Sequence, residues 1–140
     1  MSLNRRFFNI AIFVMFFVFM DQLIKYVLQT YFSFIISENY GIIFGTVENN
    51  FLKILIILIG IILLIYLIFN TDFSKFSNML AISLIIAGAI SNILDRFIYG
   101  YVVDYINLPS FLSFWPTFNL ADIFIVIGLV VYLYNFFKSK

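Results

Sequence analysis

Two aspartates, Asp104 and Asp122, are the residues of this chain whose type and placement best suit chemistry. They lie 18 positions apart, each where a polar stretch of sequence meets an apolar one. A carboxylate near a membrane boundary is costly, so its presence needs a reason. The chain has no Cys and no His, which excludes cysteine and histidine nucleophiles, histidine bases and thiolate or imidazole metal sites. Carboxylates are therefore the strongest candidates for catalysis.

The chemistry open to such a pair is hydrolysis by an activated water molecule. Two carboxylates that approach closely in a low-dielectric setting cannot both ionise, so one keeps its proton and the other is a base. The pair can activate water for attack on an amide carbonyl and protonate the departing nitrogen, without a metal, a cofactor or a covalent intermediate. The apolar and aromatic neighbours of Asp104 favour this interpretation. For Asp122 alone, simple capping of a helix N-terminus is an equally good explanation.

The composition requires a membrane around these residues. Of 140 residues, 64% are hydrophobic and only 11% are charged, against about 25% in a typical soluble domain. One small core cannot bury this much apolar surface, so the bilayer is the expected solvent. The net charge of +1 comes without a basic patch, which argues against nucleic acid as a partner.

Four apolar segments predict an all-α membrane protein with four transmembrane helices in a single membrane domain, residues 1–140. The expected spans are about 7–28, 52–69, 76–95 and 119–137, each close to the roughly 20 residues that a bilayer requires. Arg5 and Arg6 precede the first span without a cleavage pattern after it, so we expect this span to be retained. Turn residues and aromatic residues predict short β-strands in the external segment 29–51. The second external segment is 96–118.

The distribution of charge sets the expected orientation. One side of the membrane holds five basic residues, namely Arg5, Arg6, Lys75, Lys138 and Lys140. The other side holds three, namely Lys25, Lys53 and Arg96. The positive-inside rule then places both termini in the cytoplasm. Every acidic residue except Asp72 falls on the external side.

Three further polar groups lie at the predicted outer helix ends, and each has a structural and a functional interpretation. Within each group the spacing of three or four residues places the side chains on one helix face. The groups are Asp21 with Lys25, Asn92 with Asp95 and Arg96, and Asn119 with Asp122. Alone, the first group suggests an anchoring ion pair near the headgroups, and the alternative is a polar wall beside a site. The neighbours Asp95 and Arg96 suggest structural roles, although arginine can also orient a substrate.

Taken in order, the motifs resemble those of the lipoprotein signal peptidase (signal peptidase II) family over nearly the whole chain. They are Asp21-Gln22-x-x-Lys25, Asn39-x-Gly41-x-x-Phe44-Gly45, Asn92-x-x-Asp95-Arg96, Val102-Val103-Asp104 and Phe118-Asn119-x-Ala121-Asp122. One such motif is a weak signal, whereas five in order within a chain of four predicted spans are a strong one. The chain departs from the family pattern at Ala87 and Ser91, where glycine is usual, and at Ile42 and Ile43, where small residues are usual.

The resemblance implies an aspartyl endopeptidase of the bacterial inner membrane. Its implied substrates are prolipoproteins that carry diacylglycerol on a cysteine, cleaved just before that cysteine at the outer leaflet. Asp104 and Asp122 are the implied catalytic pair, and residues 31–50 match the family's small extracytoplasmic β-cradle. The implied residues that line or brace the site are Asp21, Lys25, Asn39, Gly41, Asn92, Asp95, Arg96, Asn119 and Ala121. Membrane lipids are expected partners, and the protein is expected to function as a monomer.

Two other functions remain alternatives. A small proton-coupled transporter also combines short helices with membrane carboxylates, but it predicts an acidic residue near the middle of the bilayer. The middles of the second and third spans are uncharged. A structural membrane subunit is the other alternative, and it predicts polar residues that do not converge in space.

Overall fold

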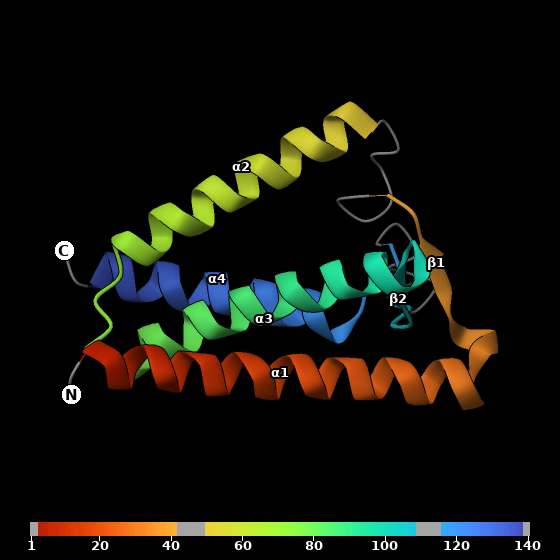
Figure 1. Cartoon of the computed structure of the whole chain (residues 1–140), viewed down its shortest axis with the longest axis horizontal. Helices are drawn as coiled ribbons and strands as arrows, with labels where there is room; N and C mark the ends of the chain where they lie inside the picture. Colours follow the sequence, from red (N-terminus) through yellow and green to blue (C-terminus); the bar gives the residue numbers. More distant parts are fainter. Residues whose placement is uncertain (1–2, 42–49, 109–115, 139–140) are drawn as a thin grey trace.

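Long helices dominate the computed structural model, which describes residues 3–41, 50–108 and 116–138. Figure 1 shows α1 (Leu3–Tyr31), α2 (Asn50–Phe69), α3 (Phe76–Tyr99) and α4 (Leu120–Lys138) running along the long axis of the molecule. The start of α1, the end of α4 and the turn between α2 and α3 lie at one end. At the other end lie the short 3₁₀ helix η1 (Ser33–Ile35) and the strands β1 (Ser37–Asn39) and β2 (Val102–Asp104).

The outward surface of the helices is apolar, as a lipid environment requires. Phe19, Ile62 and Val130 are each at least 60% exposed. Within the described residues, three stretches are long and apolar enough to cross a membrane, namely Arg5–Tyr31, Phe76–Tyr99 and Leu120–Lys138. Among the residues of α2 whose side chains are described, the continuous apolar stretch Ile57–Phe69 is shorter than these three. The expected mostly helical membrane protein is confirmed, whereas the count of four spans stays a prediction.

The central helix is α3, which packs against both α1 and α4. Two glycines allow α3 and α4 to approach closely, as small residues do in membrane bundles. A Cβ atom at Gly88 would lie 2.3 Å from the carbonyl oxygen of Ala121, and one at Gly128 would lie 2.7 Å from that of Ala81. The first contact is close to the start of α4, so it fixes where Asp122 lies relative to α3.

The connecting segments are joined by a two-stranded antiparallel sheet. Ser37 pairs with Asp104, and Asn39 pairs with Val102. Short strands were expected in residues 31–50, but the described part of that segment contains one strand of three residues. Its partner belongs to the second connecting segment, so the sheet ties the two segments together and includes Asp104.

Two helices continue past the predicted membrane spans. The first span was expected to end near residue 28, and α1 continues to Tyr31, with the Thr30 hydroxyl donating to the carbonyl of Tyr26 over 2.8 Å. The third was expected to end near residue 95, but α3 continues to Tyr99. Gly100 ends α3 in the left-handed conformation (φ 84°), with its N–H donated to the carbonyl of Arg96. The polar residues near both ends are therefore helical.

Candidate active site

Asn119 contacts both candidate catalytic aspartates and so brings them to one place. Its side-chain amide donates a hydrogen bond to Asp104 Oδ1 over 2.7 Å. Its backbone N–H donates to Asp122 Oδ2 over 3.1 Å. Asp104 is 2% exposed and Asn119 is fully buried. Residues from a strand and from a helix start, remote in the sequence, therefore converge at the end of the bundle that carries the sheet.

Asp122 caps the start of α4 and also contacts the polar cluster. It closes a capping box with Asn119, because the Asp122 N–H donates in return to Asn119 Oδ1 over 3.0 Å. Its other oxygen, Oδ1, accepts a hydrogen bond from the side-chain amide of Asn92 over 2.8 Å. The side-chain oxygen of Asn92, Oδ1, in turn accepts a hydrogen bond from the side-chain amide of Asn119 over 3.1 Å. Capping thus leaves Asp122 Oδ1 directed toward the polar cluster.

Asp104 lies in a setting that favours its protonated form. The pKa of Asp104 is raised to about 6, chiefly by burial; the hydrogen bond from Asn39 acts to lower the pKa, and the nearby charge of Asp122 acts to raise it. That bond joins the Asn39 amide to Asp104 Oδ2 over 2.9 Å. The effect of the Asp122 charge on Asp104 means that the two carboxyl groups are within electrostatic reach. Both the burial and this charge favour the protonated form of Asp104.

A buried lysine stands at the centre of the bracing residues. Lys25 is 1% exposed, and its ammonium lies 2.8 Å from Asp21 Oδ2 and 2.7 Å from Asp95 Oδ2. It also donates to the carbonyl oxygen of the Asn92 side chain over 3.2 Å. The expected ion pair of Asp21 and Lys25 is present, but both side chains are buried and not at an exposed anchoring position. Both are enclosed between α1 and α3, as the polar-wall alternative predicts.

The backbone N–H groups at the start of α4 are satisfied by side chains from other parts of the chain. Ala121 N–H donates to Asp21 Oδ1 over 2.9 Å, and Leu120 N–H donates to the Tyr105 hydroxyl oxygen over 3.2 Å. Such orphan donors need partners when a helix end is buried. Burial raises the pKa of Tyr105 to about 12, so this hydroxyl stays protonated. The position of Asp122 is thus set by α1 and the second connecting segment together.

Arg96 and Asp95 tie the connecting segments to α3. Arg96 donates from Nη1 to the carbonyl of Asn92 over 3.0 Å and from Nη2 to the carbonyl of Gly41 over 3.1 Å. Gly41 N–H donates to the side chain of Asn39. Asp95 Oδ2 accepts the N–H of Val103 over 3.1 Å, next to Asp104 in β2. Asp95 and Arg96 therefore fix the backbone beside both ends of the sheet.

Gln22 and Ser91 belong to this network, although neither was among the predicted site residues. Ser91 donates to Asp21 Oδ2 over 2.5 Å. Gln22 donates to Ser91 Oγ and to Asp95 Oδ1, both over 2.8 Å. The Asp-Gln pair and the unusual serine were visible in the sequence, but nothing local linked positions 69 residues apart. The predicted residues otherwise converge, while the motif residues Phe44 and Gly45 and the departures Ile42 and Ile43 lie outside the described residues.

Fold and site together define a helical membrane enzyme with a buried carboxylate cluster at one end. A model of the family described as "Signal peptidase (SPase) II" matches residues 9–138. Among related proteins, the lipoprotein signal peptidase of Thermodesulfovibrio yellowstonii is 37% identical over 123 residues, which cover 85% of this chain and 78% of that protein. That of Borreliella afzelii is 34% identical over an alignment of 162 positions, covering 98% and 95%. A solved bacterial membrane enzyme superposes with a TM-score of 0.74 at 27% identity, over 94% of both chains.

The chain belongs to the signal peptidase II family. Its activity is therefore that of an aspartic-type protease that removes signal peptides from prolipoproteins. This finding favours the peptidase over the transporter and the structural subunit. It also confirms the membrane location and the lipoprotein-processing role that the sequence motifs predicted.

Proposed function

We propose that Asp104 and Asp122 are the catalytic pair of this peptidase. The observation that carries the proposal is the position of Asn119, which is hydrogen-bonded to both carboxylates through its side chain and its backbone. One residue that holds two acids fixes their relative orientation, which catalysis by a shared water molecule needs. No other pair of acids in the described residues has a common neutral donor of this kind at the end of the bundle that carries the sheet.

In the proposed mechanism the pair carries one proton when substrate binds. The ionised carboxylate takes a proton from a water molecule as its oxygen attacks the scissile carbonyl carbon, and the protonated carboxyl stabilises the oxygen of the tetrahedral intermediate. A proton is then transferred to the amide nitrogen as the C–N bond breaks. The raised pKa of Asp104 supports a singly protonated pair near neutral pH. The two groups titrate together, so the proton belongs to the pair.

The proposed substrates carry diacylglycerol on the cysteine that follows the scissile bond. Such a substrate keeps its acyl chains in the bilayer while its peptide reaches the carboxylates at the membrane surface. Exposing those chains to water instead would cost about 0.8 kcal/mol per CH₂ group. A site at the ends of the helices satisfies this requirement and admits water, which the middle of the bilayer does not.

For the arrangement in the membrane, we propose four spans in one domain, with α2 as the second. Both ends of the chain are then cytoplasmic, and the carboxylate cluster lies at the outer leaflet of the bacterial inner membrane. The basic residues Arg5, Arg6, Lys75 and Lys138 at the opposite end support this orientation. Because the cluster is built from one chain, we propose that the monomer is active.

The bracing residues have positioning roles in this proposal. Lys25 balances the negative charges of Asp21 and Asp95. Asp21 accepts a backbone N–H of α4 and Asp95 accepts one of β2, each next to a member of the proposed catalytic pair. Asn39 and Asn92 each donate to one catalytic carboxylate. Arg96 and Gly41 fix the segment that follows β1. Ala121 is fully buried and contributes through its backbone N–H.

The test is cleavage of a diacylglyceryl-modified prolipoprotein by purified protein in detergent. We expect Asp104→Asn and Asp122→Asn each to lower the rate at least about a thousandfold, as loss of an essential acid–base group does. Asp72→Asn, at the opposite end of the bundle, is the matched control and should retain full activity. Cleavage by both site variants at the rate of the unaltered protein would refute the proposed pair.

A further inference from the structure

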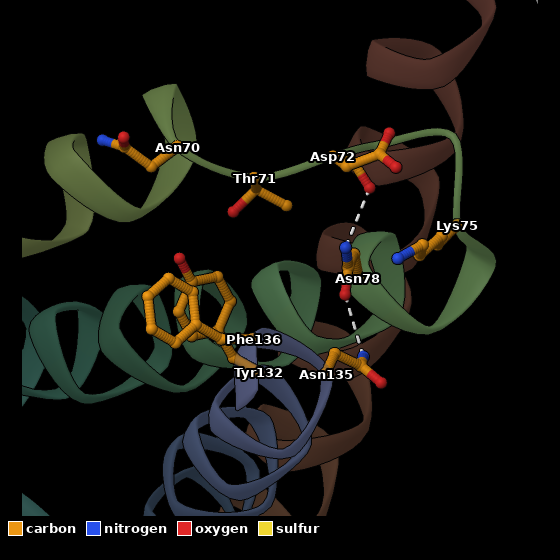
Figure 2. A pocket seen from close by; sticks show the side chains of 8 residues that line it. All are labelled: Asn70, Thr71, Asp72, Lys75, Asn78, Tyr132, Asn135 and Phe136. Atoms are coloured by element: carbon orange, nitrogen blue, oxygen red, sulfur yellow. Dashed lines mark hydrogen bonds between the residues drawn. The ribbon is translucent and has the colours of Figure 1, made fainter. Parts of the chain in front are cut away.

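Polar groups without a role in the proposed mechanism lie at both ends of the bundle. At the end opposite the sheet, the turn between α2 and α3 and the end of α4 line a cavity of about 170 Å³. Figure 2 shows that Asn135 donates to Asn78 over 2.8 Å and that Asn78 donates to the backbone carbonyl of Asp72 over 2.9 Å. These bonds tie α3 and α4 to the turn. At the end with the sheet, the hydroxyl of Tyr105 lies beside the proposed catalytic pair.

Tyr105 is held against the start of α4 at two points. Its backbone N–H donates to the carbonyl of Phe118 over 3.1 Å, and its hydroxyl oxygen accepts the N–H of Leu120 over 3.2 Å. The residue between these two partners is Asn119, which contacts both proposed catalytic carboxylates. The half-buried side chain of Tyr105 therefore spans the short segment that positions the pair.

The Tyr105 hydroxyl and the Asp122 carboxylate lie side by side at this helix start. Consecutive backbone N–H groups bind them, because Asn119 N–H donates to Asp122 Oδ2 over 3.1 Å and Leu120 N–H donates to the Tyr105 oxygen. Burial is the main cause that raises the pKa of Tyr105 to about 12, and the nearby carboxylates, first Asp21 and then the catalytic pair, act in the same direction. The phenol is thus a neutral donor within electrostatic reach of the pair.

The proton of this hydroxyl has no acceptor in the described part of the chain. A tyrosine hydroxyl can donate one hydrogen bond while it accepts others. Tyr105 accepts from Leu120, but among the described residues it donates to none. The other donor side chains around the pair already donate to oxygen atoms of the protein, and they are Lys25, Asn39, Asn92, Arg96 and Asn119. The Tyr105 O–H therefore keeps its donor capacity for an incoming group.

We propose that the Tyr105 hydroxyl is a further catalytic residue, which donates a hydrogen bond to the oxyanion formed from the scissile carbonyl. When the activated water attacks the carbonyl carbon, the electron pair of the C=O π bond moves to the oxygen. That oxygen accepts the hydrogen bond while the proton stays on Tyr105, and the bond weakens again when the carbonyl re-forms and the C–N bond breaks. A fixed donor aimed at charge that develops in the transition state is an effective catalyst. The inference rests on the proposed catalytic pair.

The first test is Tyr105→Phe, assayed as cleavage of a diacylglyceryl-modified prolipoprotein by the purified full chain in detergent. A hydrogen bond made only in the transition state affects kcat and not KM. We expect kcat to fall about 10- to 100-fold, the effect of losing one hydrogen bond to a charged group, with KM unchanged. Tyr101→Phe is the matched control, because Tyr101 lies in the same connecting segment with its ring against Tyr40 and Tyr99. It should keep its kcat.

A second variant separates this role from the hydrogen bond to Leu120, which the phenylalanine variant also loses. Replacement of Tyr105 alone by 3-fluorotyrosine keeps the hydroxyl and makes the phenol more acidic, so it becomes a stronger donor and a weaker acceptor. Donation to the oxyanion predicts a kcat about twofold higher at pH 7. A role only in holding Leu120 predicts a kcat that is unchanged or lower, and that result would overturn the inference.

Asp104→Asn in the same assay keeps the two proposals distinct. If Asp104→Asn is inactive while Tyr105→Phe cleaves with the kcat of the unaltered protein, the role of Tyr105 fails and the catalytic pair stands. If Asp104→Asn and Asp122→Asn both cleave at the full rate, the pair fails and the inference about Tyr105 fails with it. Loss of activity in both aspartate variants, together with the expected changes at Tyr105, would support both proposals.

Discussion

The two ends of the helix bundle are both rich in polar side chains, but they differ in how those groups are satisfied. At the end with the sheet, Lys25 is 1% exposed and lies within 2.8 Å of two carboxylates. At the other end, Lys75 is exposed and faces an open cavity. A closed network holds its members in fixed positions, as reacting groups require. The exposed side chains at the other end are left to interact with their surroundings.

The largest difference in stability between the two ends should appear when each of the two lysines is replaced by methionine. Lys25→Met leaves Asp21 and Asp95 buried without a cation, so we expect a loss of about 3–5 kcal/mol in the free energy of unfolding. Lys75→Met removes an exposed charge and should change it by less than about 0.5 kcal/mol in detergent without added lipid. Reversible denaturation of both variants measures the two values. Equal losses would mean that the ends do not differ in the way described.

The two glycines of the α3–α4 contact allow a second comparison, because only Gly88 lies against the start of α4 that carries Asp122. Gly88→Ala forces a Cβ against the Ala121 carbonyl beside Asp122, so it should lower both stability, by about 1–3 kcal/mol, and cleavage. Gly128→Ala makes a similar clash with Ala81 farther from the carboxylates, so it should lower stability without a matching loss of kcat. Thermal unfolding and cleavage kinetics on the same preparations separate the effects. Unchanged cleavage by the folded Gly88 variant would contradict the role of this contact.

Two buried serines of α3 provide a finer comparison. Ser91 joins Asp21 and Gln22, so Ser91→Ala should cost about 1–3 kcal/mol by leaving buried polar atoms without partners. Ser83, also fully buried, donates only to the backbone carbonyl of Met79 in its own helix. Ser83→Ala should therefore be nearly neutral. The denaturation midpoints of the two variants measure this difference. A larger loss of stability in Ser83→Ala than in Ser91→Ala would argue against the network.

The smallest expected effect is a shift in pH dependence. Asn39→Ala removes a donor that stabilises the Asp104 carboxylate and lowers its pKa, so its loss raises that pKa above about 6. The pair then keeps its last proton to higher pH. The alkaline limb of the kcat/KM profile should move upward by roughly 0.5–1 pH unit. Asn107→Ala, in the same connecting segment as Asp104, is the control, and a downward shift in the Asn39 variant would contradict the assigned hydrogen bond.

Much of this arrangement could be predicted from the sequence because its signals are local. Helical spacing placed Asn92 with Asp95, and Asn119 with Asp122, on shared faces, and apolar run lengths predicted the helices. Partners across the bundle were not predictable in this way. The contact of Gln22 with Ser91 depends on the register of α1 against α3, and the β1–β2 pairing depends on both connecting segments.

Counting formal charges around the carboxylate cluster leads to a rule for inhibitor design. The cluster contains Asp21, Asp95, Asp104 and Asp122 against Lys25 and Arg96, so four acids minus two bases leave two surplus negative charges, or one with a shared proton. Two like charges 4 Å apart near a protein surface repel by about 4 kcal/mol. Compounds that mimic the tetrahedral intermediate with a carboxylate or phosphonate are thus disfavoured here, and neutral or amine-bearing mimics are the better starting chemistry.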